Sequence, residues 1–571
     1  MGSPGSPVAL DAVVARPPSP HLGPSAPPPR RSWPGWVAPV LAVLPFAVML
    51  VTLGVQRPPI TSYGDRAITA LEVRDLMRGR QLLGAYSRFG WHHPGPAFLI
   101  PLAAADVALG RAHWALDAGM LAAGAAAAAA LVWVVGRAAG WLAAWAAAGT
   151  VGLYVHAVGP AVFRDPWNPW ATLLPLGLLT VLCGAAGAGS IPALAASVVV
   201  ASVIIQTHLA AAPVALGLVA TAAVMAWWIR RREGSGERAA SPWRRPAVLA
   251  AIAVGVAVWV PPLIQEATGD DPNLSDLWRF FVDGHPGHSL STAMGAVGDR
   301  LGQLPFGSPT HFMATTTAAG WGHVGGALTT VALYLVAGVA VAVLGHRRGD
   351  GFARALGVLT VVAIATAVLA VHTAAGPLQA FVIGWVTAIP IGCWMGVASL
   401  LLGPSHGRRP APGAPRPAPG SRRVPPALAA AAAGALVVAG TAAGTAAAAA
   451  APSAATETAP QVTEAWAQLR SGLAGRAGGS VLLLMDDPGD WPVQAGLALE
   501  LEEHGWRAHV GDEWVFMLGP ARRETGHESL VATLHVSADG HPTVRVTSPL
   551  GPQGLRAAAA RVAAVLGTGP A

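Results

Sequence analysis

Charged and aromatic side chains gather in one short segment, residues 63–96, of a chain that is otherwise strongly apolar. Asp65 in this segment could act as a general base that takes a proton from an acceptor hydroxyl. The arginines that follow could hold a phosphate group by charge-assisted hydrogen bonds, and these are Arg74, Arg78, Arg80 and Arg88. The competing interpretation is a solvated loop whose Asp/Arg pairs contact lipid headgroups.

Further polar groups stand at the ends of later apolar runs. Asp165 lies in the sequence FRDPWNPW, residues 163–170, where Asp-Pro and Asn-Pro equally favour a capped turn. Gln206 and His208 join two apolar runs, and polar groups at membrane level indicate a functional site. A lone histidine there is nevertheless often a packing residue, and Glu266 suits an interfacial anchor as well as a site. The histidine pair of the first segment, His92 and His93, completes the candidate substrate-binding set.

These residues do not require a metal centre. A divalent metal ion that bridges the carboxylates is compatible with the chemistry, so the metal ligands stay unassigned and no cofactor is certain. The pair His285 and His288 has metal-ligand spacing, but close histidines in a Gly/Pro loop are more often only polar. Cys183 and Cys393 lie inside apolar runs, which argues against a disulfide framework or a Cys-based metal site.

The composition sets the class of protein that must position these side chains. Of 571 residues, 53% are hydrophobic and 11% are charged, whereas soluble domains carry about 25% charged residues. This excludes an ordinary soluble enzyme and also a disordered chain, which needs few apolar residues. All 36 basic residues are arginine and most lie in short loops between apolar runs, so we expect no nucleic-acid partner. The chain is predicted to be a polytopic α-helical membrane protein.

Apolar runs predict about 11 transmembrane helices. The first is 36–55, and the others are 113–136, 139–159, 169–187, 190–207, 209–229, 246–264, 320–345, 355–372, 377–402 and 426–451. Arginine pairs and triplets fall on alternate loops, which the positive-inside rule places in the cytoplasm. The N-terminus is therefore expected inside and the C-terminal region outside. Pro94–Gly110 is too short to span and is predicted to be an interfacial or half-inserted helix.

Three regions follow from this pattern. Residues 1–33 are rich in Pro and Ser and predict a disordered cytoplasmic tail, and residues 34–451 form the transmembrane domain with outer loops 57–112 and 265–318. Residues 452–571 predict a small extracytoplasmic α/β domain. Its expected strands are 480–485, 514–518, 530–536 and 543–546, and its expected helices are 492–504 and 555–566.

Three motifs in order carry a family resemblance. A Gly-Asp pair lies shortly after the first span, a His-Pro-x-Pro segment opens a short apolar helix about 30 residues later, and Asp-Pro follows the third span. This pattern resembles the type-C (GT-C) superfamily of membrane glycosyltransferases, which includes protein O-mannosyltransferases and aminoarabinose transferases. More narrowly, it is similar to an actinobacterial branch with YSRFGWxHPGP, DPWNP and QTH segments. The resemblance covers roughly residues 34–270.

The resemblance implies roles for individual positions. The superfamily's first-loop catalytic acid falls on Asp65, the second-loop acid falls on Asp165, and the basic residue before the paired prolines falls on His93 or His92. One position departs from the pattern, because many members carry a second acid where this chain has Arg66. The next acid along the chain is Glu72.

These features predict a glycosyltransferase in the cytoplasmic membrane whose active face is extracytoplasmic. It would move a sugar from a polyprenyl-phosphate donor to a glycan, lipid or protein acceptor of the cell envelope, and the lipid bilayer is its other partner. Asp65 would be the general base, and Asp165 would position the acceptor or stabilise charge on the sugar. The alternatives are a non-catalytic scaffold, to which Arg66 points, and a transporter or flippase, which would need more ionisable residues inside its spans.

Overall fold

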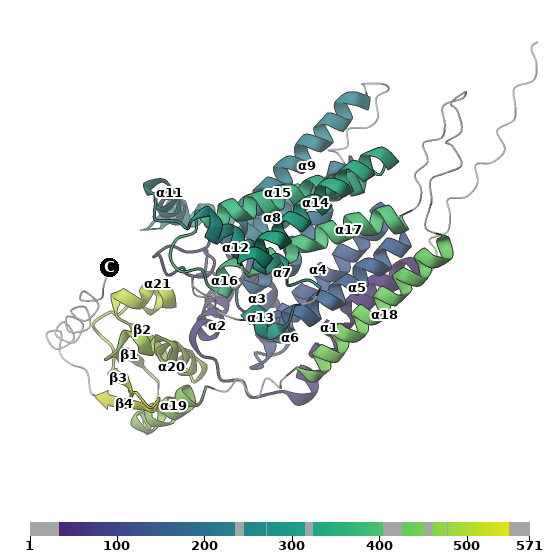
Figure 1. Cartoon of the computed structure of the whole chain (residues 1–571). Helices are drawn as coiled ribbons and strands as arrows, with labels where there is room; N and C mark the ends of the chain where they lie inside the picture. Colours follow the sequence, from purple (N-terminus) through teal and green to yellow (C-terminus); the bar gives the residue numbers. More distant parts are fainter. Residues whose placement is uncertain are drawn as a thin grey trace, which may run out of the picture.

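The computed structural model of the chain is dominated by long apolar helices (Figure 1). It describes residues 34–233, 245–269, 271–305, 307–313, 324–403, 425–451, 459–476 and 478–547. The predicted tail, residues 1–33, and the predicted helix 555–566 lie outside the described residues.

Ten helical segments among the described residues are long and apolar enough to cross a membrane. They correspond to the predicted runs, with the 17-residue helix α8 (Ile191–Thr207) as the eleventh apolar segment. The polytopic helical class is therefore confirmed. The principal helices are α1 (Pro34–Gln56), α4 (Ala115–Ala139), α5 (Trp141–Val158), α7 (Leu173–Gly187), α9 (Ala212–Glu233), α10 (Pro246–Thr268), α14 (Val324–Arg348), α15 (Gly351–His372), α17 (Ile389–Leu402) and α18 (Pro426–Ala450).

Small residues let some of these helices approach closely. The Ala-rich helix α18 packs along α5 and α1, and all three lie side by side in Figure 1. A Cβ atom added to Gly440 of α18 would overlap the backbone of Gly149 in α5, so the two backbones are in contact. Close backbone approach at small residues is the usual basis of helix association in lipid.

Short helices lie between the spans at the end of the molecule that carries the candidate site. They include α2 (Gly64–Met77), α6 (Pro160–Arg164), α11 (Asn273–Asp283), α12 (Leu290–Leu301), α13 (Pro309–Met313) and α16 (Ala380–Ile383). The predicted short apolar helix is α3 (Leu99–Ala108). It buries Leu99 and Leu102 and exposes Ile100 and Val107. Ten residues span only about 15 Å, too short to cross a bilayer.

The C-terminal region contains a four-stranded sheet in the order β2-β1-β3-β4. Strands β1 (Ser480–Met485), β2 (Arg507–Val510) and β3 (Leu530–Val536) are parallel, and β4 (Pro542–Thr547) is antiparallel to β3. Helices α19 (Pro460–Leu473) and α20 (Trp491–Glu503) pack beside the sheet. We call residues 459–547 the C-terminal unit.

Two of the predicted strands are confirmed with both of their ends, and one predicted strand was wrong. β1 and β3 begin and end as expected, but residues 514–518 form a turn of helix that includes α21 (Val515–Leu518). The fourth strand is instead β2, before that turn. A short apolar run does not distinguish a strand from a helical turn in the core, because periodicity over so few residues fits both. Gly519, with φ of +91°, ends the turn.

The C-terminal unit is docked on α2. Ala67, Ile68 and Leu71 of α2 belong to the same buried cluster as the apolar side chains of α20 and the sheet. Three ion pairs border this contact and join Arg74 to Glu503, Arg78 to Glu502 and Arg522 to Asp75. Helix α2 is therefore held between the membrane-spanning helices and the C-terminal unit.

Candidate functional site

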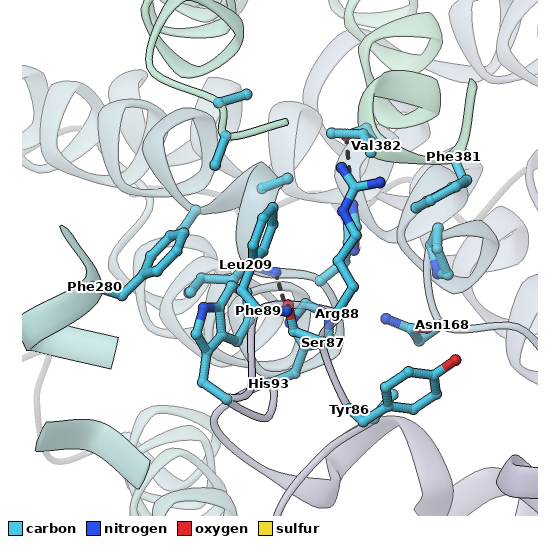
Figure 2. A pocket seen from close by; sticks show the side chains of 18 of the residues that line it. Tyr86, Ser87, Arg88, Phe89, His93, Asn168, Leu209, Phe280, Phe381 and Val382 are labelled. Atoms are coloured by element: carbon cyan, nitrogen blue, oxygen red, sulfur yellow. Dashed lines mark hydrogen bonds between the residues drawn. The ribbon is translucent and has the colours of Figure 1, made fainter. Parts of the chain in front are cut away.

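A cavity of about 660 Å³ opens where α2, the segment 85–93 and the ends of several spans meet. One part of its wall is polar, and another part is formed by Leu216 of α9, Ala370 at the end of α15 and Phe381 of α16. Figure 2 shows Tyr86, Arg88, His93 and Asn168 around this space. Four of the predicted site residues line it together, namely Asp65, Arg88, His93 and His208.

Asp65 lies in the first turn of α2, where the helix dipole favours an anion. Its Oδ1 accepts a hydrogen bond of 2.7 Å from the hydroxyl of Tyr86. Burial raises the pKa of Asp65 above its ordinary value, while the Tyr86 hydrogen bond acts in the opposite direction. A carboxylate with a raised pKa is a stronger base than a solvated one, which suits proton abstraction.

Glu72 lies two turns further along α2 and also lines the cavity. Burial raises the pKa of Glu72 to about 8, and the negative charges of Asp65 and Asp75 raise it further against the charge of Arg522. Its Oε2 is buried and accepts no hydrogen bond within the described part of the chain. At neutral pH the site therefore holds a mainly protonated Glu72 on the same helix as Asp65.

His93 and His208 form a neutral pair in the cavity wall, with ring centroids 5.4 Å apart. His93 Nδ1 accepts a hydrogen bond of 3.1 Å from the backbone N–H of Leu209, drawn in Figure 2. Burial first, and then the neighbouring histidines, hold the pKa of His93 well below its ordinary value. Burial lowers the pKa of His208 to about 4. Both rings are thus uncharged hydrogen-bonding groups at neutral pH.

Arg88 is the predicted phosphate-binding arginine that reaches the cavity. Its guanidinium donates to Gln379 Oε1 at 3.4 Å and to the carbonyl of Pro377 at 3.3 Å, and it lies over the ring of Phe89. These contacts are long, so the guanidinium keeps capacity for a charged ligand.

The other three predicted arginines are not in the cavity. Arg74 pairs with Glu503 at 2.6 Å and Arg78 pairs with Glu502 at 3.1 Å, so both bind the C-terminal unit. Arg80 is exposed beyond the end of α2. Sequence spacing does not show whether an arginine in an outer loop binds a phosphate or a protein carboxylate, because both are anions that pair with a guanidinium group.

The remaining predicted residues surround the cavity without lining it. Asp165 ends α6, and its neighbours Trp167, Asn168 and Pro169 line the wall instead. His92 is held by Asn273, whose Oδ1 accepts from the His92 backbone N–H at 2.8 Å.

Gln206 and Glu266 hold neighbouring helices together. Gln206 donates from Nε2 to the carbonyl of Val258 in α10 at 2.8 Å. The carboxylate of Glu266 accepts from the backbone N–H of Leu274 at 2.8 Å and so caps the start of α11.

Arg66, at the position where many GT-C members carry a second acid, has a structural partner. It forms an ion pair with Asp117 in the first turn of α4, and Arg164 approaches the same carboxylate at 3.6 Å. Asp117 is fully buried. The positive charge of Arg66 therefore stabilises a buried acid and ties α2 to α4.

Sequence patterns identified Asp65, whereas the roles of Glu72 and Tyr86 emerged only from packing. Tyr86 is placed by an antiparallel bridge to His92, and its ring packs edge-on against Trp491 and Phe516 of the C-terminal unit. The spacing of Asp65 and Glu72, seven positions on one helix, is the signal that indicates a shared face.

Two findings complete the description of the site. Across the described ranges, no group of three or more His, Cys, Asp or Glu side chains is arranged to hold a metal ion. No protein-family model, curated protein or solved structure matches this chain.

Proposed function

We propose that this protein is a membrane glycosyltransferase that transfers a sugar from a polyprenyl-phosphate donor to a hydroxyl acceptor, with Asp65 as general base. The observation that carries the proposal is the position of Asp65, hydrogen-bonded by Tyr86 in a cavity whose opposite wall is apolar. A lipid-linked sugar needs both surfaces, because its chain is apolar and its reacting phosphate is charged.

During the transfer, each proton and each electron pair moves to a group in or near the cavity. Asp65 takes the proton from the acceptor hydroxyl, whose oxygen forms a bond to the anomeric carbon. The bond from that carbon to the phosphate oxygen breaks on the opposite face, and its electron pair leaves with the phosphate beside Arg88. Single displacement inverts the anomeric centre. Protonated Glu72 and neutral His93 and His208 supply hydrogen bonds to sugar hydroxyls.

The proposal also includes the orientation of the chain in the membrane and the class of acceptor. The arginine-rich loops assign the opposite ends of the spans to the cytoplasm, so the cavity would face the outside of the cytoplasmic membrane, and the N-terminus would lie inside. The acceptor would be a glycan, lipid or protein of the cell envelope. Asp165, one turn from Asn168, would act on the acceptor through the segment 165–169.

The test measures transfer of radiolabelled sugar from a panel of polyprenyl-phosphate sugars. Membranes come from cells that lack the native gene and express wild type, Asp65→Asn or the control Asp276→Asn at matched levels. Such membranes supply the native acceptor. Loss of a general base costs about 100-fold or more, so we expect Asp65→Asn to lose transfer and Asp276→Asn, on α11, to retain it. Equal transfer by all three would exclude Asp65 from catalysis and favour the scaffold.

A further inference from the structure

A second cavity, of about 880 Å³, lies at the other end of the spans. Helix α9 connects the two, because Ala212 lines the first cavity and Arg230 lines the second. Eighteen residues of helix separate them by about 27 Å. Figure 1 shows this end of α9 pointing away from the C-terminal unit.

Three arginines from three helix ends line the second cavity, and they are Arg137 of α4, Arg230 of α9 and Arg245 before α10. The structure treats neighbouring arginines differently. Arg231 and Arg232 lie over the rings of Trp227 and Trp228 at 4.1 and 4.6 Å, along the outside of α9. The triplet 230–232 is thus divided between the cavity and the helix surface.

The lining of this cavity carries more positive than negative charge. The carboxylate of Asp350 also lines it; it accepts from the backbone N–H of Ala353 at 2.9 Å and from the hydroxyl of Ser399 at 2.6 Å, so it caps α15. Within the described residues, Arg137, Arg230 and Arg245 have no ion pair with a carboxylate at 4.0 Å or less. Three arginines against one carboxylate favour an anionic ligand.

Apolar side chains form the remaining wall. Val134 of α4, Leu182 of α7 and Ala196 of α8 line the cavity beside the arginines. The first turns of α8 and α15 also line it, and both are capped by side chains of the chain itself, Ser190 and Asp350. The arginines would therefore supply the contacts to an anion, and the apolar wall would contact an apolar portion of the same ligand.

We propose that this second cavity binds a phosphate-bearing ligand through Arg137, Arg230 and Arg245, and that its apolar wall selects the phosphodiester headgroup of an anionic phospholipid. Basic cavities between spans bind lipid headgroups in this way. The inference does not depend on the proposed glycosyltransferase activity, because none of these arginines lines the first cavity.

The experiment compares two charge-matched variants of the purified, delipidated full-length protein. R137Q/R230Q removes two cavity arginines, and R231Q/R232Q removes two arginines of the same region that do not line the cavity. Phosphatidylglycerol, phosphatidylcholine and inorganic phosphate are the probes. Native mass spectrometry measures lipid binding, and thermal melting measures protection by each probe.

We expect wild type to bind phosphatidylglycerol more tightly than phosphatidylcholine, and R137Q/R230Q to weaken phosphatidylglycerol binding about 30-fold. R231Q/R232Q should change it less than about threefold. The proposal would be overturned if both variants weakened phosphatidylglycerol binding equally. It would also be overturned if wild type showed no preference for phosphatidylglycerol and no thermal protection by inorganic phosphate. If inorganic phosphate protects wild type to the same extent as phosphatidylglycerol does, the ligand is not a lipid headgroup, and that part of the proposal is overturned. If R137Q/R230Q melts below wild type without lipid, R230Q/R245Q, which also removes two cavity arginines, replaces it under the same criteria.

Discussion

At the scale of single residues, two carboxyl groups of one helix have different surroundings in the cavity. The Tyr86 hydroxyl donates to Asp65 and lowers its pKa, against the larger and opposite effect of burial. Glu72 is buried with one oxygen that has no hydrogen-bond partner among the described residues, and burial raises its pKa to about 8. Glu72 is therefore mainly protonated at neutral pH.

Replacing Tyr86 by Phe tests the hydrogen bond to Asp65. The bond lowers the pKa of Asp65, so its loss raises that pKa and the base form appears at higher pH. We expect the acid limb of the pH–rate profile to be displaced to higher pH, with less sugar transfer than wild type along that limb. Ser87→Ala, which removes another hydroxyl from the cavity wall, is the control and should leave the limb in place. An unchanged limb in Tyr86→Phe would contradict this role.

Glu72→Gln tests burial of the second carboxyl group. The pKa of Glu72 rises from 4.5 to about 8 on folding, so the folded protein holds a proton that the unfolded chain releases between these values. The free energy of unfolding therefore falls as pH rises from about 4.5 to 8, by up to about 5 kcal/mol for this group. Glu72→Gln should melt at a higher temperature than wild type at pH 8, and the difference should vanish near pH 4.5.

The control for this measurement is Glu464→Gln, a half-exposed acid of α19. Its melting temperature should follow wild type across the whole range, because its side chain is half exposed and its pairing with His541 lies at the surface, where an ion pair contributes about 0–1 kcal/mol. A Glu72→Gln protein that melts with the wild-type pH dependence would show that Glu72 is solvated.

At the scale of elements, α2 has two functional faces. One face carries Asp65 and Glu72 into the cavity, and the other carries Asp75 to the C-terminal unit. Arg522 is almost fully buried there and bonds Asp75 at 2.6 Å and Glu502 at 2.8 Å. The C-terminal unit therefore fixes the position of the helix that presents the candidate base.

Arg522→Gln should undock the C-terminal unit from α2. Removing one partner of a buried ion network costs about 3–5 kcal/mol, because the other charges stay buried without compensation. We expect faster hydrogen exchange in α2 and β1. The adjacent Arg523 pairs with Asp512 at an exposed position, where an ion pair contributes about 0–1 kcal/mol, so Arg523→Gln should exchange like wild type. Equal exchange in the two variants would contradict the docking role.

The contact between α5 and α18 gives a second test at this scale. A Cβ atom at Gly440 would overlap the carbonyl oxygen of Gly149, whereas one at Gly434 of the same helix meets nothing within 4 Å. Gly440→Ala should therefore lower the melting temperature in detergent, by separating two helices in contact. Gly434→Ala should leave it unchanged or raise it, since Ala favours a helix by about 1 kcal/mol. The reverse order would exclude close packing at Gly440.

At the scale of the whole molecule, the two cavities occupy opposite ends of the spans and the C-terminal unit lies at the end with Asp65. This arrangement separates the proposed chemistry from the proposed anion site by the thickness of the helical bundle. It also requires the 57–112 loop and the C-terminal unit to be on one side of the membrane.

Cysteine labelling in intact cells tests this arrangement. Phe89→Cys and Arg507→Cys are expected to react with a membrane-impermeant maleimide, and Arg231→Cys only after permeabilisation, because all three positions are exposed and the positive-inside rule orients them. The native Cys183 and Cys393 are buried and serve as the unlabelled background. Labelling of positions 89 and 507 from opposite sides would contradict the docked C-terminal unit, and a fully reversed pattern would contradict the outer placement of the cavity.

Local properties of the sequence determined the membrane-spanning segments, strands β1 and β3, and a candidate base at Asp65. Hydropathy and alternation are sums over neighbouring residues, so they can be evaluated without knowing the fold. The same rule fails for residues 514–518, because the run is too short for its periodicity to separate helix from strand.

Only the tertiary structure decided which polar groups share the cavity. Arg74 and Arg78 bind acids of the C-terminal unit more than 400 positions away, and Asn168 rather than Asp165 lines the wall. The pKa of Glu72 is raised by burial and by the charges of Asp65 and Asp75, and the burial exists only in the folded chain. Pairing and burial depend on distances between segments remote in sequence, and these distances are set by packing, which no local pattern contains.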